Sequence, residues 1–258
     1  MSRTPPRRYW LTGASNGIGT ALAEEILKTG AHLAVSSRSL APLKALSQRY
    51  PGQVLVVAGD LTNSQQVREI GEQIARQWGS LDTMILNAGT CEYVDVNQLD
   101  SSIIEHIVRT NLLASSYCSE VARPLLRAGT APHLVALASS VTYLPLPQAE
   151  AYGDSKPGLR QLFESLRNDM ASENIEMTIV SPGFMDTPLK NDVSQYLDWS
   201  ANKAARRLFD LLKHRPQELP LPELLMPVLW PLPPNPGQRG LEIGKRRERS
   251  NPPSEDLP

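Results

Sequence analysis

The chain has 258 residues, a formal net charge of −1 and 21% charged residues. That length suits one α/β domain with a sizeable core, and the balanced charge argues against nucleic-acid binding as the main function. The two cysteines, Cys91 and Cys118, cannot build a disulfide framework, and no second Cys or His stands at metal-ligand spacing, so we expect a reducing, cytoplasmic setting and no metal.

The first predicted element is a strand at residues 9–11, which the N-terminus reaches without the apolar core of a signal peptide. No uninterrupted apolar stretch of about eighteen residues occurs in the sequence, so no membrane-spanning helix is expected. After the strand, Ile18, Leu22 and Ile26 recur at helical spacing, and Gly30 is expected to cap that helix.

The turn between this strand and this helix is rich in glycine. Gly13, Gly17 and Gly19 form the pattern G-x-x-x-G-x-G, which differs from the G-x-G-x-x-G fingerprint. Glycines let a backbone approach a pyrophosphate, and the helix N-terminus offers amide donors and the positive end of a dipole. Taken alone, a tight turn that only needs glycine explains the pattern equally well.

The same residues also match G-x-S-x-G, the nucleophile elbow of α/β-hydrolases, with Ser15 as the nucleophile. An elbow normally follows several strands, whereas this one follows the first. It leaves Gly19 unexplained, and His133 and His214 stand in no recognisable triad context. A serine hydrolase is therefore the less favoured alternative.

A second strand at residues 32–37 ends at Arg38. In dinucleotide-binding folds the end of this strand meets the adenosine ribose, where an acid binds the 2′-hydroxyl and an arginine accommodates a 2′-phosphate. Ser37 and Arg38 occupy this place and no acid does, which favours NADP over NAD. A solvated arginine after a strand is the competing interpretation.

A third strand leads to Asp60, which could accept from an adenine amino group or cap the next helix. A fourth strand at residues 82–86 runs into small residues at 87–89, at the strand end where open parallel sheets bind ligands. The long helical region over residues 99–128 carries Asn111 near its middle. Because asparagine is unfavourable in mid-helix, a buried backbone contact or a water site is expected there.

An apolar run that begins at Leu134 ends in Ser139 and Ser140, and further on Tyr152 precedes Lys156 by four residues. On a helix this spacing puts the phenol and the ammonium on one face. An ammonium roughly 4 Å away contributes on the order of 4 kcal/mol, which lowers a phenol pKa of about 10 by about three units at most. Such a phenol suits general acid–base catalysis, although a Tyr–Lys pair alone is more often a surface pair.

Strands and helices alternate along most of the chain, which predicts a parallel sheet covered by helices on both faces, in three αβα layers. Residues 1–214 are predicted to form one domain, with a substrate loop at about 188–200. Residues 215–258 hold 11 of the 22 prolines, so we expect an extended tail that packs over the substrate side or a subunit interface and is disordered at its end. The basic run at 245–249 would suit a membrane surface, but a solvated terminal charge run is the favoured interpretation.

Together these features resemble the classical short-chain dehydrogenases/reductases. The resemblance covers about residues 8 to 190, and its pieces occur in the order typical of the family. The matching pieces are Thr12, Gly13, Gly17, Ile18, Gly19, Asp60, Asn87-Ala88-Gly89, Asn111, Ser139, Tyr152, Lys156 and the run from Ser181-Pro182-Gly183 to Thr187.

The resemblance implies a Rossmann-type doubly wound sheet and hydride transfer between NADP(H), or less favourably NAD, and a carbonyl or alcohol. Tyr152 would be the general acid–base, and Lys156 would lower its pKa and bind the nicotinamide ribose. Ser139, or alternatively Ser140, would position the substrate oxygen, and Asn111 would hold a proton-relay water. The implied cofactor-binding residues are Gly13, Ser15, Asn16, Gly17, Ile18, Gly19, Arg38, Asp60, Leu61, Asn87, Ala88, Gly89, Tyr152, Lys156, Pro182, Gly183 and Thr187.

Two departures from the family pattern are Asp154, where alanine is usual, and Pro157 after the lysine. Because proline is tolerated in the first helical turn, the helix is expected to start close to Tyr152. Asp154 and Pro157 keep open a non-catalytic dinucleotide-binding sensor or regulatory protein, and epimerase or dehydratase chemistry also stays open. The apolar loop and tail suggest a lipophilic substrate, and the long helices 99–128 and 152–173 suggest a homodimer.

Overall fold

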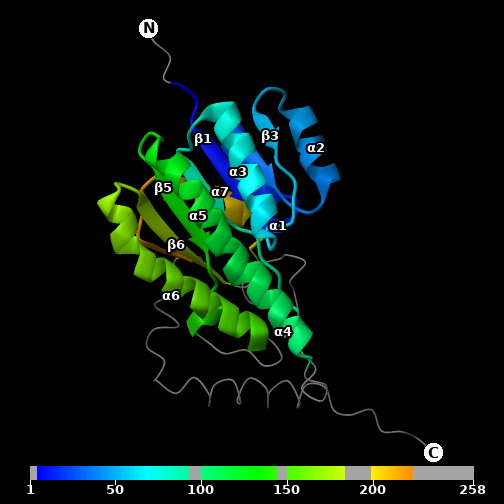
Figure 1. Ribbon diagram of the computed structural model, residues 1–258, viewed down its shortest axis with the longest axis vertical. Coiled ribbons are helices and arrows are strands. Elements are labelled where there is room, and N and C mark those ends of the chain that lie inside the picture. The colour runs from blue at the N-terminus through cyan, green and yellow to red at the C-terminus, as the bar shows by residue number, and fades with distance from the viewer. Residues whose placement is uncertain (1–4, 93–99, 144–149, 184–198, 223–258) are drawn as a thin grey trace, which may run out of the picture.

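The computed structural model describes residues 5–92, 100–143, 150–183 and 199–222. Within these residues the chain forms one parallel sheet of seven strands in the order β3-β2-β1-β4-β5-β6-β7 (Figure 1). The chain builds β1 to β3 outward on one side and then crosses over to build β4 to β7 on the other, which confirms the predicted doubly wound sheet. The strands are β1 (Arg8–Thr12), β2 (His32–Ser36), β3 (Val54–Val56), β4 (Thr83–Leu86), β5 (His133–Leu137), β6 (Glu176–Pro182) and β7 (Glu218–Leu221).

Helices cover both faces of the sheet, and the side chains of each strand alternate between the two faces. In β4, Met84 and Leu86 pack on the face covered by α3, α5 and α6, whereas Ile85 packs on the face covered by α1, α2 and α7. In Figure 1, α5 and α6 lie in front of the sheet and α7 behind it. This confirms the three-layer architecture. The helices are α1 (Gly17–Leu27), α2 (Leu40–Arg49), α3 (Ser64–Trp78), α4 (Ser101–Val108), α5 (Ala114–Arg127), α6 (Glu150–Ser172) and α7 (Ala201–Leu212).

The predicted end of the first helix was wrong in detail. The structure ends α1 at Leu27 with Lys28 as the C-cap residue, and Gly30 follows in the left-handed region with φ of 81°. The long helical region predicted over residues 99–128 is confirmed, because α4, a π-helical segment η1 (Arg109–Leu113) and α5 follow one another directly from Ser101 to Arg127. Among the helices that the structure describes, none is both long and apolar enough to cross a bilayer.

The seventh strand, β7, lies beyond the predicted domain division at residue 214. It pairs with β6 despite Pro220, because a proline is tolerated in a strand at the edge of a sheet. Arg160 of α6 fixes it with a bidentate ion pair to Glu218, at 2.7 and 3.2 Å. The division at 214 stays a prediction, but the sheet itself continues to Leu221.

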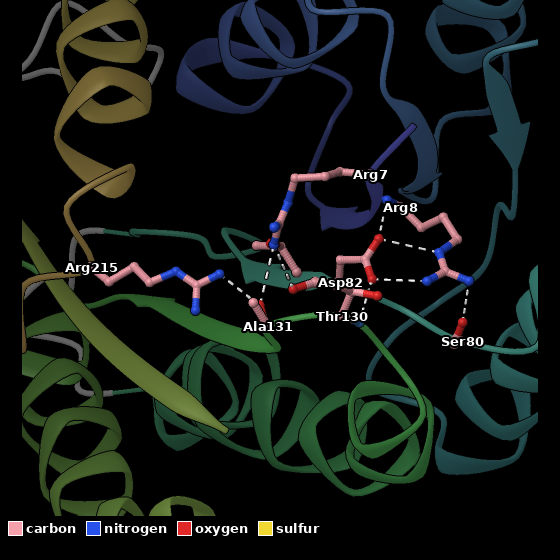
Figure 2. A network of polar contacts seen from close by, with 8 residues as sticks. Arg7, Arg8, Ser80, Asp82, Thr130, Ala131 and Arg215 are labelled. Carbon is pink, nitrogen blue, oxygen red and sulfur yellow. Dashed lines mark hydrogen bonds and ion pairs between the residues drawn. The ribbon is translucent and has the colours of Figure 1, made fainter. Parts of the chain in front are cut away.

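A polar network ties the strands together at their amino-terminal edge (Figure 2). The Asp82 carboxylate, on a residue only 3% exposed, accepts from the Arg8 main chain (2.8 Å), from the Arg8 guanidinium (2.9 and 3.2 Å) and from Thr130 N (2.7 Å). Burial raises the pKa of Asp82, but these hydrogen bonds outweigh burial and hold the pKa below its usual range. Arg7 and Arg215 donate together to the Ala131 carbonyl, at 3.3 and 2.6 Å. The hydrogen bonds and ion pairs at this edge therefore stabilise the sheet.

Candidate active site

The predicted site residues gather at the opposite edge of the sheet, where the carboxyl ends of the strands meet. The glycine-rich loop follows β1, residues 87–89 follow β4, Ser139 follows β5, and Gly183 follows β6. Strand order reverses between β1 and β4. A reversal of this kind opens a crevice at the carboxyl ends of a parallel sheet, which is the usual place for a ligand.

The glycine-rich loop folds so tightly that side chains are excluded from it. Gly13 has φ of 67°, and a Cβ there would lie 2.8 Å from the Ala88 Cα. A Cβ on Gly19 would lie 2.0 Å from the Gly13 carbonyl oxygen. Within the described residues, the Asn16 side chain makes no capping hydrogen bond at the start of α1. The Asn16 side chain therefore does not occupy the first amides of α1, and the N-terminal end of a helix suits a bound phosphate.

Asn87 holds this loop against β4. Its Nδ2 donates to the carbonyls of Thr12 (3.1 Å) and Gly13 (3.0 Å), while Thr12 Oγ1 accepts from the main-chain N–H groups of Asn87 and Ala88, both at 3.0 Å. The sequence predicted that Asn87 lines the adenosine side of a cofactor. The clamp on the glycine-rich loop is a further role that no local signal in the sequence indicated.

The residues predicted to meet the adenosine lie around the ends of β2 and β3. Arg38 is exposed just after β2, beside Ser37, whose hydroxyl donates to Ser39 O at 2.9 Å. The cap role considered for Asp60 is wrong, because the N-cap of α3 is Asn63. Asp60 Oδ1 instead accepts from Thr62 N and Thr62 Oγ1, at 2.9 and 2.8 Å.

Three other residues predicted to bind the cofactor are partly or fully buried. Ser15 is half-buried in the glycine-rich loop, and Ile18 and Leu61 pack in the two hydrophobic cores, one on each face of the sheet.

Tyr152 and Lys156 lie one turn apart on α6. The Lys156 Nζ is 5.7 Å from the centre of the Tyr152 ring and donates to the Leu137 carbonyl at 2.9 Å. Lys156 is 5% exposed, and burial lowers the pKa of its ammonium to about 8, although Cys91 nearby works in the opposite direction. Ser139 is 8% exposed at the end of β5, so the site brings a phenol, an ammonium and a hydroxyl to one edge.

The prediction of a buried backbone contact for Asn111 is confirmed. Asn111 lies in η1 and is fully buried; its Oδ1 accepts from Thr90 N (2.8 Å), and its Nδ2 donates to Thr90 O (2.9 Å) and to Ser155 Oγ (2.9 Å). A Cβ added to Gly89 would lie 3.1 Å from Asn111 Oδ1 and 3.4 Å from Lys156 Nζ. The amide, the ammonium and this glycine therefore converge.

The stretch of α6 around Tyr152 is intrinsically a poor helix. The structure starts α6 at Glu150, close to Tyr152 as predicted, but Pro157 lies past the first turn, contrary to prediction. A proline inside a helix costs about 3 kcal/mol relative to alanine, and each glycine about 1 kcal/mol; Gly153 and Gly158 flank it. Contacts from outside the helix must hold this turn. Asp154 is exposed, so water screens its charge from the buried ammonium.

His133 lies at the opposite edge from Ser15, because it is the first residue of β5. Its Nε2 lies 2.8 Å from Thr178 Oγ1, whose single hydrogen goes to the Pro216 carbonyl, so the imidazole must donate. Burial, together with Arg215 and Arg7, lowers the pKa of His133 to about 3. This histidine cannot serve Ser15 as a base, which removes a candidate from the hydrolase alternative.

Several predicted residues lie outside the described residues. They are Thr187, the predicted substrate loop from residue 188 up to residue 198, and the tail beyond residue 222 with its basic run at 245–249. Pro182 and Gly183 are described, and Gly183 N donates to Leu221 O at 2.8 Å.

The sequence is similar to a known protein family and to several curated proteins. A family model described as short chain dehydrogenase matches residues 9–198. The chain is 32% identical to "11-beta-hydroxysteroid dehydrogenase-like 3" from Arabidopsis thaliana over 77% of this chain and 68% of that protein. Two further plant relatives are covered over only 59% and 52% of their own lengths.

Solved structures share the fold. A short-chain dehydrogenase from Streptomyces avermitilis matches with a TM-score of 0.76 at 19% identity, over 95% of this chain and 96% of that one. An alcohol dehydrogenase from Thermococcus sibiricus, complexed with 5-hydroxy-NADP, matches with a TM-score of 0.75 at 23% identity, over 84% of this chain and 96% of that one. With a family match over residues 9–198, the chain belongs to the short-chain dehydrogenase/reductase family and is an oxidoreductase of that family.

Proposed function

We propose that the protein interconverts a carbonyl and an alcohol with NADP(H), and that Tyr152 is the general acid–base. The observation that carries this proposal is the convergence of Tyr152, the buried ammonium of Lys156 and Asn111 at the carboxyl edge of the sheet. The tight glycine-rich loop and the uncapped start of α1 fit a dinucleotide phosphate beside that group.

The chemistry divides between cofactor and chain. The bound nicotinamide supplies the hydride in reduction and accepts it in oxidation. In reduction, the Tyr152 phenol donates its proton to the carbonyl oxygen as that oxygen gains negative charge. The Ser139 hydroxyl, or alternatively that of Ser140, donates a hydrogen bond to the same oxygen. Tyr152 is left as a phenolate, which the Lys156 ammonium stabilises until the phenol regains a proton from solvent.

Lys156 sets the pH range of this arrangement. Burial lowers its pKa to about 8, so the side chain is mainly charged near pH 7 and loses its charge as the pH rises through that value. The charged form lowers the pKa of the Tyr152 phenol. The ammonium therefore assists the Tyr152 phenol below about pH 8, and this assistance is lost as the pH rises above that value.

NADP is proposed in preference to NAD because of Arg38. This exposed arginine directly follows Ser37 after β2, where an arginine suits a 2′-phosphate. The solved relative from Thermococcus sibiricus, which carries 5-hydroxy-NADP, supports the same choice. The name of the Arabidopsis relative contains "hydroxysteroid dehydrogenase-like", which supports a lipophilic substrate. A homodimer and a cytoplasmic location stay predictions.

A fluorescence titration with NADPH and NADH tests the cofactor assignment. We expect the parent to bind NADPH more tightly, and Arg38→Ala to lose about tenfold in NADPH affinity, since 1.4 kcal/mol corresponds to tenfold. Arg68→Ala is the matched control, because Arg68 is exposed on α3 and bonds only to Gln65 among the residues that the structure describes. Equal NADPH affinity in Arg38→Ala and Arg68→Ala would contradict the assignment.

A further inference from the structure

We propose that Ser155 is a positioning residue for Tyr152 and Lys156, which connects the buried amide of Asn111 to the catalytic turn of α6. This inference rests on the proposed function, because it assigns Ser155 a part in the action of those two side chains.

The Asn111 amide has a single possible orientation. A main-chain N–H can only donate, so Thr90 N fixes Oδ1 on its own side at 2.8 Å. The two hydrogens of Nδ2 then point to Thr90 O and to Ser155 Oγ, each at 2.9 Å. The single hydrogen of Ser155 goes to the Tyr152 carbonyl at 3.0 Å. The chain of hydrogen bonds therefore runs in one direction, from Asn111 through Ser155 to Tyr152.

Burial makes this connection hard to replace. Asn111 is 0% exposed and Ser155 is 1% exposed, so solvent has no access to either group. Removing the Ser155 hydroxyl would leave one Asn111 N–H without an acceptor, which a buried donor tolerates poorly.

The catalytic turn needs such external contacts because its own hydrogen bonding is weak. Pro157 has no N–H, so the Gly153 carbonyl loses its intrahelical donor, and Gly153 and Gly158 add backbone freedom. Lys156 is fixed through the Leu137 carbonyl, and Ser155 fixes the Tyr152 end of the turn. The same Asn111 amide holds both the N–H and the carbonyl of Thr90, next to the Gly89 backbone that faces Lys156.

A serine that bonds back to a preceding carbonyl is common in helices and often has no further role. Ser165 in the same helix does this, with its hydroxyl donating to Gln161 O at 2.9 Å on the exposed side. Ser155 differs because it also accepts a hydrogen from a buried partner on another element. Ser165→Ala is therefore the matched control.

The test measures the pKa of Tyr152 without cofactor, from the ultraviolet tyrosinate signal of each protein minus that of the same protein carrying Tyr152→Phe. In Ser155→Ala we expect this pKa to rise by about one unit, a tenfold loss of phenolate stabilisation, because the ammonium is held less firmly beside the phenol. Ser155→Thr keeps the hydroxyl and is expected to restore the parent value. Ser165→Ala is expected to titrate like the parent.

Thermal melts and NADPH titrations accompany each variant. A lowered melting temperature in Ser155→Ala with an unchanged Tyr152 pKa would show a purely structural role and overturn the inference, while the proposed function would stand. A Tyr152 that titrates at the ordinary pKa of about 10 in the parent, or a parent that does not bind NADPH, would overturn the proposed function itself and this inference with it.

Discussion

Asp82→Asn tests whether the polar network at the amino-terminal edge fastens the sheet. The substitution keeps the shape of the side chain but replaces one carboxylate oxygen with an N–H₂ group. Asp82 accepts four hydrogen bonds, two at each oxygen. Two donors would therefore lose their acceptor and face another donor.

The magnitude follows from these contacts. Two lost bonds to a charged acceptor, at about 1.5 kcal/mol each, give about 3 kcal/mol. This is the low end of the range of about 3–5 kcal/mol for breaking a buried ion pair, which is appropriate because the Arg8 side chain is 25% exposed and water can partly solvate it. In a chain of this size the melting temperature should fall by about 6 to 12 °C.

Urea denaturation measures the change in the free energy of unfolding at pH 7. The matched control is Asp210→Asn, which breaks an exposed ion pair to Lys213 of 2.7 Å and should cost less than about 1 kcal/mol. NADPH affinity should be unchanged in both variants, since the network lies at the opposite edge from the site. An Asp82→Asn protein no less stable than Asp210→Asn would refute this reasoning.

Three further predictions concern pH and packing. The His133 pKa falls from 6.5 to about 3 on folding, so the unfolded chain binds more protons than the folded chain between these pH values. The free energy of unfolding should therefore fall below about pH 6.5, by up to about 1.4 kcal/mol per pH unit. Acid denaturation of His133→Gln should lack that contribution. Because the ammonium of Lys156 loses its charge above about pH 8, NADPH-dependent ketone reduction should decline there, and in Lys156→Arg the decline should move to higher pH; identical pH profiles would exclude Lys156 as the cause. Gly89→Ala should lower kcat about tenfold, since its Cβ would crowd Asn111 Oδ1 and Lys156 Nζ. Gly153→Ala is the control and should keep kcat, because its Cβ meets nothing within 4 Å. Equal losses of kcat in both variants would argue against the crowding.

The sequence predicted the sheet and the gathering of the site because both depend on local patterns. Apolar runs such as residues 134–138 alternate with helical periodicity, and parallel strands bring their carboxyl ends to one edge. Asn111 was also predictable as unusual, since its low helix propensity indicated another purpose. The π-helical form of η1 was not, because i→i+5 hydrogen bonding leaves no distinct pattern in the sequence.

The missed features depend on partners distant in the sequence. Asp82 pairs with Arg8, 74 residues away, and β7 is defined by its register with β6 and by the ion pair of Glu218 with Arg160, 58 residues away. The position of Pro157 inside α6 is tolerated because contacts from other elements hold the turn, which no helix rule can anticipate. The clamp of Asn87 on the glycine-rich loop, 74 and 75 residues away, belongs to the same class.

The most direct measurement of the central claim is NADPH oxidation with a ketone panel (acetophenone, cyclohexanone and androstenedione), comparing the parent with Tyr152→Phe. We predict that the parent reduces at least one ketone, that Tyr152→Phe loses about 100-fold or more in kcat, and that both bind NADPH with equal affinity. A ketone that Tyr152→Phe reduces as fast as the parent would contradict the acid–base role. NADPH binding without reduction of any ketone would contradict the proposed carbonyl reduction and favour a dinucleotide sensor.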